Sequence, residues 1–221
     1  MLKAIIFDMD GVLINSTPYV RKSFEKILKE NGLILSEGYD DKMTGMSLKS
    51  KMTHWKNDFG FEYDIQDFSN RATEMQIKLM TEAGEFNKNT NLIDFIENAK
   101  KANLKLAVAT SSMKERSLKF LELLGIQKFF DEVITAEDVE KHKPNPDIFL
   151  KAAAKLNIEP KGCIVIEDAI NGIEAAHKAG MKVVGKVTSI FNESDLSIAD
   201  LVINDFSELS IEKLKQLLKI F

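Results

Sequence analysis

The second half of the chain alternates short apolar segments with longer segments of helical periodicity. The apolar segments occur at 104–109, 132–135, 163–166, 182–185 and 201–203, and the helical patterns at 92–99, 112–124, 146–156 and 172–179. Near-continuous apolar strands separated by helices indicate a parallel sheet that is covered by helices on both faces. The pattern therefore predicts an α/β fold with a Rossmann-like, doubly wound parallel core.

The first half of the chain has a different character. It begins with one more apolar run, Ala4 to Phe7, whose residues suit the interior of the same sheet. From there to about residue 85 the periodicity is helical only, with Val20, Phe24, Ile27 and Leu28 on one helix face. We therefore predict a core made of residues 1–14 and 87–221, with residues 15–86 inserted as a helical cap.

Two carboxylates follow the first apolar run directly, in the sequence FDMDGVL. Asp8 and Asp10 are two residues apart, so in an extended segment they point the same way. Gly11 behind them allows a sharp turn. A DxD sequence alone is weak evidence, because acids are common after strands. Such a pair can divide labour, with one carboxylate attacking or binding metal while the other carries a proton.

Other strand ends also carry polar residues, and ligands of open parallel sheets bind at the carboxyl ends of the strands. After 104–109 comes Thr110, whose hydroxyl can hold a phosphate oxygen together with the first amides of the next helix. After 132–135 comes Lys143, which lies in a loop with two prolines. After 163–166 come Glu167 and Asp168, which are costly to bury without a cation. Their oxygen ligands favour Mg²⁺.

Several of these residues also have purely structural interpretations. Ser112 with Glu115 predicts a capping box, and Asp168 is a candidate helix N-cap. The remaining predicted helix starts are Thr17 and Asn145 as N-caps, followed by Pro18 and Pro146 at the first helical positions.

Composition limits the partners and the compartment. The net charge is −4, without long runs of one sign, which disfavours nucleic acid or an anionic membrane as the main partner. Cys163 is the only cysteine, so an intrachain disulfide or a cysteine zinc cluster is excluded. The start of the sequence does not read as a signal peptide, and no apolar run reaches about 20 residues. We expect a cytoplasmic protein, and a monomer.

Four segments together resemble the ordered motifs of the haloacid dehalogenase superfamily. They are FDMDGVL, VATSS, KPNPDIF and VIEDAINGIEAAHKAGM. The resemblance covers the whole chain and is strongest to the branch with a helical cap after the first motif, which includes β-phosphoglucomutase-like and phosphoglycolate-phosphatase-like enzymes. It implies a small phosphorylated metabolite as substrate and Mg²⁺ as cofactor.

The resemblance also implies roles for particular residues. Asp8 would be the nucleophile that forms an aspartyl-phosphate. Asp10 would protonate the leaving group and then activate water, so that it carries a proton at first. The phosphate-binding residues would be Thr110, Ser111 and Lys143. The metal ligands would be the Asp8 carboxylate, the Asp10 backbone carbonyl, Asp168 and Glu167, the last either directly or through water.

Departures from the family pattern bear on the reaction. Val20 stands where the β-phosphoglucomutases have a histidine that couples cap closure to catalysis, and Leu48 stands where they have an arginine for the distal phosphate. The segment 44–48, which contains Gly45, resembles the specificity loop of the family, and Lys49 or Lys51 could replace the arginine. Gly45 and Lys49 are therefore the predicted substrate-binding residues of the cap. We therefore favour a Mg²⁺-dependent phosphatase of a small phosphomonoester, such as a sugar phosphate, over a β-phosphoglucomutase.

Two other classes fit less well. A 2-haloacid dehalogenase needs neither Asp10 nor Asp168. A receiver domain, which is a phospho-accepting switch, also combines acids, threonine and lysine at a sheet edge, but it is shorter and has no helical insertion. The three histidines, His54, His142 and His177, are expected to be surface or partly packed residues, with His142 near enough to Lys143 to tune its charge.

Overall fold

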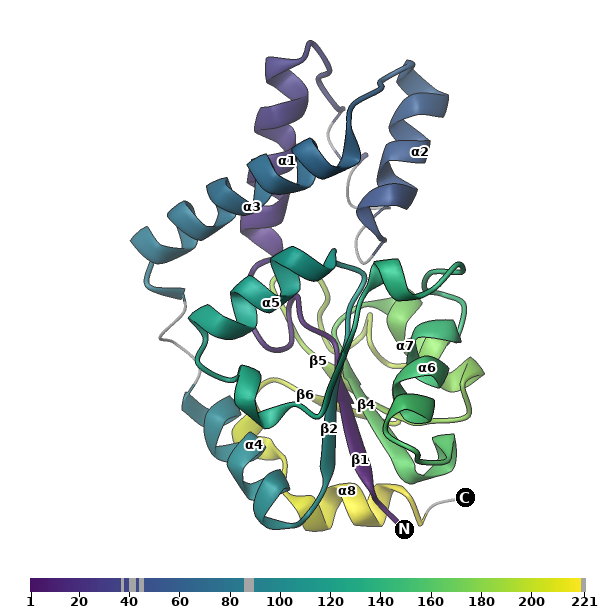
Figure 1. The fold of residues 1–221 in the computed structure, drawn as a ribbon. Helices are drawn as coiled ribbons and strands as arrows, with labels where there is room; N and C mark the ends of the chain where they lie inside the picture. The colour runs from purple at the N-terminus through teal and green to yellow at the C-terminus, as the bar shows by residue number, and fades with distance from the viewer. Residues whose placement is uncertain (37, 40–42, 44–45, 86–89, 220–221) are drawn as a thin grey trace.

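A computed structural model describes residues 1–36, 38–39, 43, 46–85 and 90–219 (Figure 1). Its centre is a six-stranded sheet in the order β3-β2-β1-β4-β5-β6, in which all neighbouring strands are parallel. The strands are β1 (Ala4–Phe7), β2 (Lys105–Ala109), β3 (Glu132–Ile134), β4 (Cys163–Glu167), β5 (Lys182–Lys186) and β6 (Leu201–Ile203). The order runs outward in both directions from β1, so the predicted α/β, Rossmann-like fold is confirmed.

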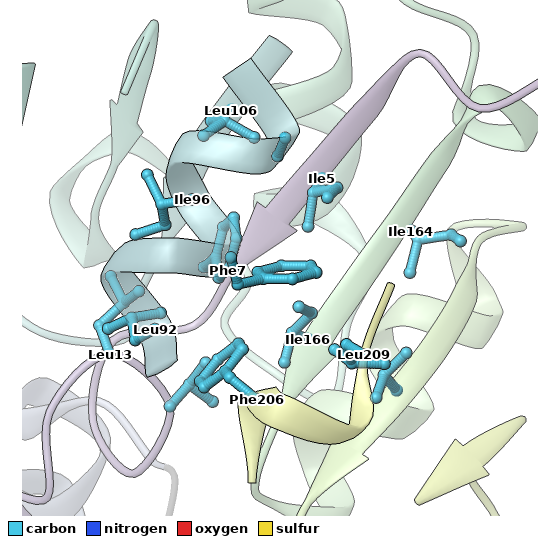
Figure 2. Close-up of a cluster of buried hydrophobic side chains, with 14 of the residues drawn as sticks. Ile5, Phe7, Leu13, Leu92, Ile96, Leu106, Ile164, Ile166, Phe206 and Leu209 are labelled. Atoms are coloured by element: carbon cyan, nitrogen blue, oxygen red, sulfur yellow. The ribbon is translucent and has the colours of Figure 1, made fainter. Parts of the chain in front are cut away.

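Helices cover both faces of this sheet. One face packs against α4 (Thr90–Lys101), α5 (Lys114–Leu123) and α8 (Ile211–Leu217), and the other against α6 (Asp147–Lys155) and α7 (Ile170–Lys178). Side chains alternate between the two cores along each strand: Ile5 and Phe7 enter the first core, while Ala4 and Ile6 enter the second. Figure 2 shows the first core, where Phe7 lies among side chains from neighbouring strands and helices.

Short 3₁₀ helices lie between several of these elements. They are η3 (Gln127–Phe129), η4 (Ala136–Asp138), η5 (Pro160–Gly162) and η6 (Phe206–Glu208). Neither these nor α8 was anticipated from the sequence. Within the described ranges, no helix is both long enough and apolar enough to span a bilayer.

The inserted segment forms three helices with a core of their own. They are α1 (Thr17–Glu30), α2 (Leu48–Phe59) and α3 (Ile65–Glu82), and they lie beyond the carboxyl ends of the strands (Figure 1). Trp55, Phe68 and Phe24 are the large aromatic residues of this small core. The described part of the insertion contains no strand, as expected. The domain boundaries at residues 14 and 86 stay a prediction.

Helix α3 follows the apolar periodicity of its sequence at Phe68 and Ala72, which are both buried. In the last turns the same spacing predicts Met75 and Leu79, which are only half-buried, whereas Gln76 and Met80 are buried. Gln76 is only 1% exposed, so a polar side chain takes a place where the pattern suggests an apolar one. A buried amide requires hydrogen-bond partners, and these are found at the functional site.

Three predicted helix starts are wrong. Helix α1 begins at Thr17 itself, with Ser16 as the N-cap residue. Helix α5 begins at Lys114, and the expected capping box does not form because the Ser112 hydroxyl is bound elsewhere. Helix α6 follows Pro146 as N-cap, and the Asn145 amide donates to the carbonyl of His142. The alternative role of Asp168 as an N-cap is also excluded, since α7 has Ala169 at that position.

Candidate active site

Strand register brings the first two acids together. Phe7 of β1 pairs with Ile166 of β4, and the backbone N–H of Asp8 donates to the Ile166 carbonyl at 2.9 Å. Asp8 therefore lies beside Glu167, where both strands end. Both carboxylates are buried, with Asp8 6% and Glu167 1% exposed.

Lys143 joins these two acids from the loop that follows β3. Its Nζ donates to Asp8 Oδ1 at 2.6 Å, to Glu167 Oε2 at 2.8 Å and to the Ala109 carbonyl at 3.2 Å. The ammonium also lies 4.9 Å from the ring centroid of Phe149, a favourable cation–π distance. With only 3% of its side chain exposed, Lys143 is fully committed to this site.

The cluster holds more negative than positive charge. One oxygen from each of Asp8, Glu167 and Asp168 lies within 4.8 Å of the others, and all three residues are buried. Burial raises the pKa of Asp8 to about 7, with Lys143 opposing the shift and Glu167 adding to it. Burial and then Glu167 raise the pKa of Asp168 well above its usual value. Burial lowers the pKa of Lys143, but Asp8 and Glu167 outweigh it, so the net shift is upward.

A hard divalent cation fits this donor set. Three carboxylates supply the oxygen ligands that Mg²⁺ prefers, and a dication offsets the charge that one ammonium leaves unbalanced. The backbone makes room for the third acid at Gly11, where a Cβ would lie only 1.9 Å from Asp168 Oδ2. A second gap lies at Gly172, where a Cβ would meet the Glu167 carboxyl at 2.1 Å. The two glycines thus leave the space that these carboxylates occupy.

The carboxylate of Asp10 has a different set of partners. Arg116 donates from Nη2 to Oδ1 at 2.6 Å and from Nη1 to Oδ2 at 2.9 Å. The hydroxyls of Ser16 and Ser112 donate to the same two oxygens. Burial alone would raise the pKa of Asp10, but Arg116 and the two serines outweigh it and lower the pKa. Asp10 is therefore ionised in this arrangement, which differs from the proton that we expected it to carry.

Sequence reasoning missed Arg116. The residue lies within α5, where a basic side chain is usually solvated, yet it is only 7% exposed. The available signal was weak: Arg116 follows Ser112 by four residues, and its Nη1 lies 2.7 Å from the Ser112 hydroxyl. A charged residue at that spacing is common on any helix.

The predicted phosphate-binding residues lie at the end of β2. Thr110 is 1% exposed, and its hydroxyl accepts a hydrogen bond from the Ser112 amide at 3.1 Å. Ser111 is half-buried. Both residues line the same cavity as Asp8, Lys143 and Asp168.

This cavity, of about 110 Å³, lies between the sheet end and the inserted helices. Its lining from the helical segment includes Val20, Leu48, Lys51 and Gln76. Of the two cap residues predicted for substrate binding, Gly45 lies outside the described residues. The other, Lys49, is exposed and outside this lining.

His142 is partly buried next to Lys143, as expected from the sequence. Burial lowers the pKa of His142, and the charge of Lys49 lowers it further. His142 is therefore neutral near pH 7. The charge of Lys49 is thus felt in the loop that carries His142 and Lys143.

Known proteins resemble this chain over nearly its whole length. A phosphorylated carbohydrates phosphatase of Thermotoga maritima is 28% identical over 87% of this chain and 88% of that protein. A β-phosphoglucomutase of Bacillus subtilis is 29% identical over 97% of this chain and 95% of that protein. The crystal structure of a β-phosphoglucomutase from Clostridium difficile matches with a TM-score of 0.83 at 25% identity, covering 99% of this chain and 98% of that chain.

The family model of the haloacid dehalogenase-like hydrolases matches residues 5–186, which include all but the first residue of β1, the inserted helices and β2 to β5. The match thus contains Asp8, Lys143 and Asp168, the residues that meet at the sheet end. The chain is an enzyme of the haloacid dehalogenase-like hydrolase family.

Proposed function

We propose that this enzyme is a Mg²⁺-dependent phosphatase that hydrolyses a small phosphomonoester through an aspartyl-phosphate on Asp8. One observation carries the proposal: Lys143 Nζ bridges Asp8 and Glu167 beside Asp168, at the base of a cavity that the inserted helices cover. Phosphoryl transfer needs this combination of an anionic nucleophile and nearby positive charge.

In the first step an oxygen of the Asp8 carboxylate attacks phosphorus. The new O–P bond forms as the bond from phosphorus to the ester oxygen breaks, and that oxygen leaves with a proton from Asp10. In the second step water attacks phosphorus and gives its proton to Asp10, and the bond to Asp8 breaks. Inorganic phosphate and the free carboxylate of Asp8 are the products.

Charge repulsion is the main obstacle to the first step. A carboxylate about 4 Å from one phosphate charge is repelled by about 4 kcal/mol at an effective dielectric constant of 20. Lys143 offsets part of this repulsion, because its ammonium already contacts Asp8. Mg²⁺, held by Asp8, Asp168 and Glu167, would supply Lewis-acid stabilisation of the phosphoryl oxygens. Thr110 and Ser111 would hold these oxygens through hydrogen bonds.

Asp10 has to change partners during this cycle. In the present arrangement its ionised carboxylate has the protonation state of the base that takes a proton from water. To act as an acid toward the leaving group, Asp10 must carry a proton on Oδ2 and exchange the contacts of that oxygen with Ser112 and Arg116 Nη1 for the substrate, while Oδ1 stays bound to Arg116 Nη2.

The substrate we propose is a phosphorylated sugar or a similar polar metabolite. The relative from Thermotoga maritima is named for phosphorylated carbohydrates. Helix α3 adds Ser69 and Thr73 to the cavity lining, and such side chains can bind the hydroxyls of a sugar. We also propose that residues 15–86 act as a cap that excludes water, and that the enzyme works as a cytoplasmic monomer.

A β-phosphoglucomutase is the second candidate. It is favoured by the match to the Clostridium difficile enzyme and by Lys51, a buried cation in the cavity lining. Val20 is evidence against a mutase. This residue lines the cavity at the position where the sequence resemblance places the mutase histidine.

A panel of phosphomonoesters, assayed with and without Mg²⁺, separates these functions. The panel includes β-glucose 1-phosphate with a trace of the 1,6-bisphosphate. Mg²⁺-dependent release of inorganic phosphate is the expected result. Formation of glucose 6-phosphate without phosphate release would reverse the ranking, and a phosphoenzyme that persists for minutes would favour a receiver-like switch.

A further inference from the structure

A chain of buried hydrogen bonds runs from the inserted helices to Asp10. Gln76 of α3 donates from Nε2 to the Ser23 hydroxyl of α1 at 2.8 Å, and Ser23 donates to the Val20 carbonyl at 2.8 Å. On its other side, Gln76 Oε1 accepts from Arg116 Nε at 2.8 Å. Gln76 and Ser23 are at most 1% exposed, so this chain is shielded from water.

Arg116 is fixed on every side. Its Nη1 and Nη2 atoms bind the two oxygens of Asp10, and its Nε binds Gln76. The guanidinium face lies 4.3 Å from the ring centroid of Phe120 in the same helix. Contacts at its edge and at its face hold the planar guanidinium in one orientation. The two-point contact then fixes the orientation of the Asp10 carboxylate as well.

We propose that Arg116 is a positioning residue for Asp10, and that Gln76 makes the orientation of Arg116 depend on the position of helix α3. This inference rests on the proposed function, because it assumes that Asp10 transfers protons. Arg116 comes from α5 of the core and Gln76 from the inserted segment, so the contact crosses from one to the other (Figure 1).

The chemistry of the two side chains explains why both are needed. Asp10 is the carboxylate that the described structure pairs with Arg116, and the pairing holds the side chain against Ser16 and Ser112. Gln76 occupies the Nε of Arg116, which keeps Nη1 and Nη2 directed at Asp10. If α3 moves away, Nε loses its acceptor and the guanidinium can rotate. A displacement of α3 would thus change the orientation of the Asp10 carboxylate through Gln76 and Arg116.

A double-mutant cycle tests whether Arg116 acts through Asp10. Arg116→Lys keeps the positive charge, and therefore a partner for Asp10, but loses the two-point contact. With p-nitrophenyl phosphate and Mg²⁺, we expect kcat to fall about tenfold, a part of the 10²–10⁴-fold effect of general acid–base catalysis. In an Asp10→Asn background the same substitution should change kcat by less than about twofold, because coupled residues are not additive.

Gln76→Leu tests the link to the helical segment and has a matched control. Gln66 lies on the same helix, and its Nε2 donates to Glu115 of α5 at 3.2 Å, on the exposed side. Both glutamines therefore join α3 to α5, but Gln76 alone of the two contacts Arg116. We expect Gln76→Leu to lower kcat about threefold to tenfold, again only when Asp10 is present, and Gln66→Leu to leave kcat unchanged.

The outcomes separate this inference from the proposed function. Circular dichroism melts first establish that each variant is folded. If Gln76→Leu does not fold, the double-mutant cycle of Arg116→Lys and Asp10→Asn alone tests the positioning role. Wild-type protein without phosphatase activity would overturn the proposed function itself. An active wild type in which the losses from Arg116→Lys and Asp10→Asn are additive would leave the function intact and overturn the positioning role. Equal losses from Gln76→Leu and Gln66→Leu would overturn the link to α3.

Discussion

Gly11 and Asp168 are in such close contact that no other residue fits at position 11. A Cβ on Gly11 would lie 1.9 Å from Asp168 Oδ2 and 2.4 Å from its Cγ. Gly11 also has a positive φ of 83°, which favours glycine. The turn after β1 and the acid after β4 therefore depend on each other.

Gly11→Ala should for this reason remove activity as well as stability. The alanine strains the backbone by about 1–2 kcal/mol and also displaces the Asp168 carboxylate from the acid cluster. Gly180→Ala is the matched control, because Gly180 has a φ of 74° with nothing within 4 Å of a Cβ. Urea denaturation should show a loss for both variants, larger for Gly11→Ala because of the clash with Asp168, while phosphatase assays should show inactivity only for Gly11→Ala. Full activity of Gly11→Ala would contradict the tight contact.

Asp8→Asn should abolish turnover and leave the fold intact. The amide keeps the shape of the side chain, but it cannot form the acyl-phosphate. It also removes a charge from a cluster that holds three carboxylates and one ammonium. Mg²⁺-dependent phosphate release and the circular dichroism spectrum are the measurements. Appreciable residual turnover would refute Asp8 as the nucleophile.

Lys143→Met should destabilise the protein strongly and inactivate it. Removing one partner of a buried ion pair costs about 3–5 kcal/mol, and Lys143 contacts both Asp8 and Glu167. Adding Asp8→Asn to this variant should restore part of the stability, because one uncompensated charge is removed. Urea denaturation of both variants measures the effect, and a double variant no more stable than Lys143→Met would exclude this account.

Mg²⁺ should stabilise the protein more at about pH 8 than at about pH 5. The pKa of Asp8 rises from its usual 3.8 to about 7 in the folded, metal-free protein. The folded state then holds this proton more tightly than the unfolded state, so metal-free stability falls as the pH rises through about 7. Mg²⁺ binding requires ionised carboxylates, so the Mg²⁺ affinity of the folded protein increases as the pH rises through about 7.

Melting temperatures with and without Mg²⁺ at the two pH values measure this difference. Asp168→Asn provides the control and should abolish the Mg²⁺ effect at both. A larger shift at the lower pH would argue against carboxylate ligands.

Asp131 should contribute stability that is lost only in acid. Its carboxylate accepts from the Leu106 amide, Lys105 and Lys100 at 2.9–3.0 Å. Burial opposes the shift, but these donors lower the pKa of Asp131 to about 2. The contribution, about 2 kcal/mol, is present above the unfolded pKa of about 4 and disappears as the pH falls through about 2.

Asp131→Asn should accordingly be less stable than the wild type at pH 7, with the difference closing in acid. Glu122→Gln is a suitable control, because it removes an exposed i,i+3 pair with Lys119 and should change little. Urea denaturation as a function of pH is the measurement. A difference that persists below about pH 2 would mean that charge is not its cause.

The sequence alone predicted the sheet and the residues at its end. Parallel strands present their carboxyl ends at one edge, so acids and a lysine that follow separate strands are expected to meet. Asp8, Lys143 and Asp168 meet in this way. Local patterns were less reliable for helix starts, because Ser112 and Asn145 had competing partners that the local sequence does not reveal.

What the sequence determined by itself is the order of the strands along the chain and the α-helices that connect most of them, and with it the edge where the carboxylates gather. That information is local, since it depends on apolar periodicity and on the residue that follows each strand. Only the tertiary structure decided the partners of Asp10. Arg116 lies 106 residues from Asp10 and 40 from Gln76 along the chain. Such contacts depend on how α3 packs over α5, because a buried guanidinium takes whichever acceptors the assembled fold presents to it.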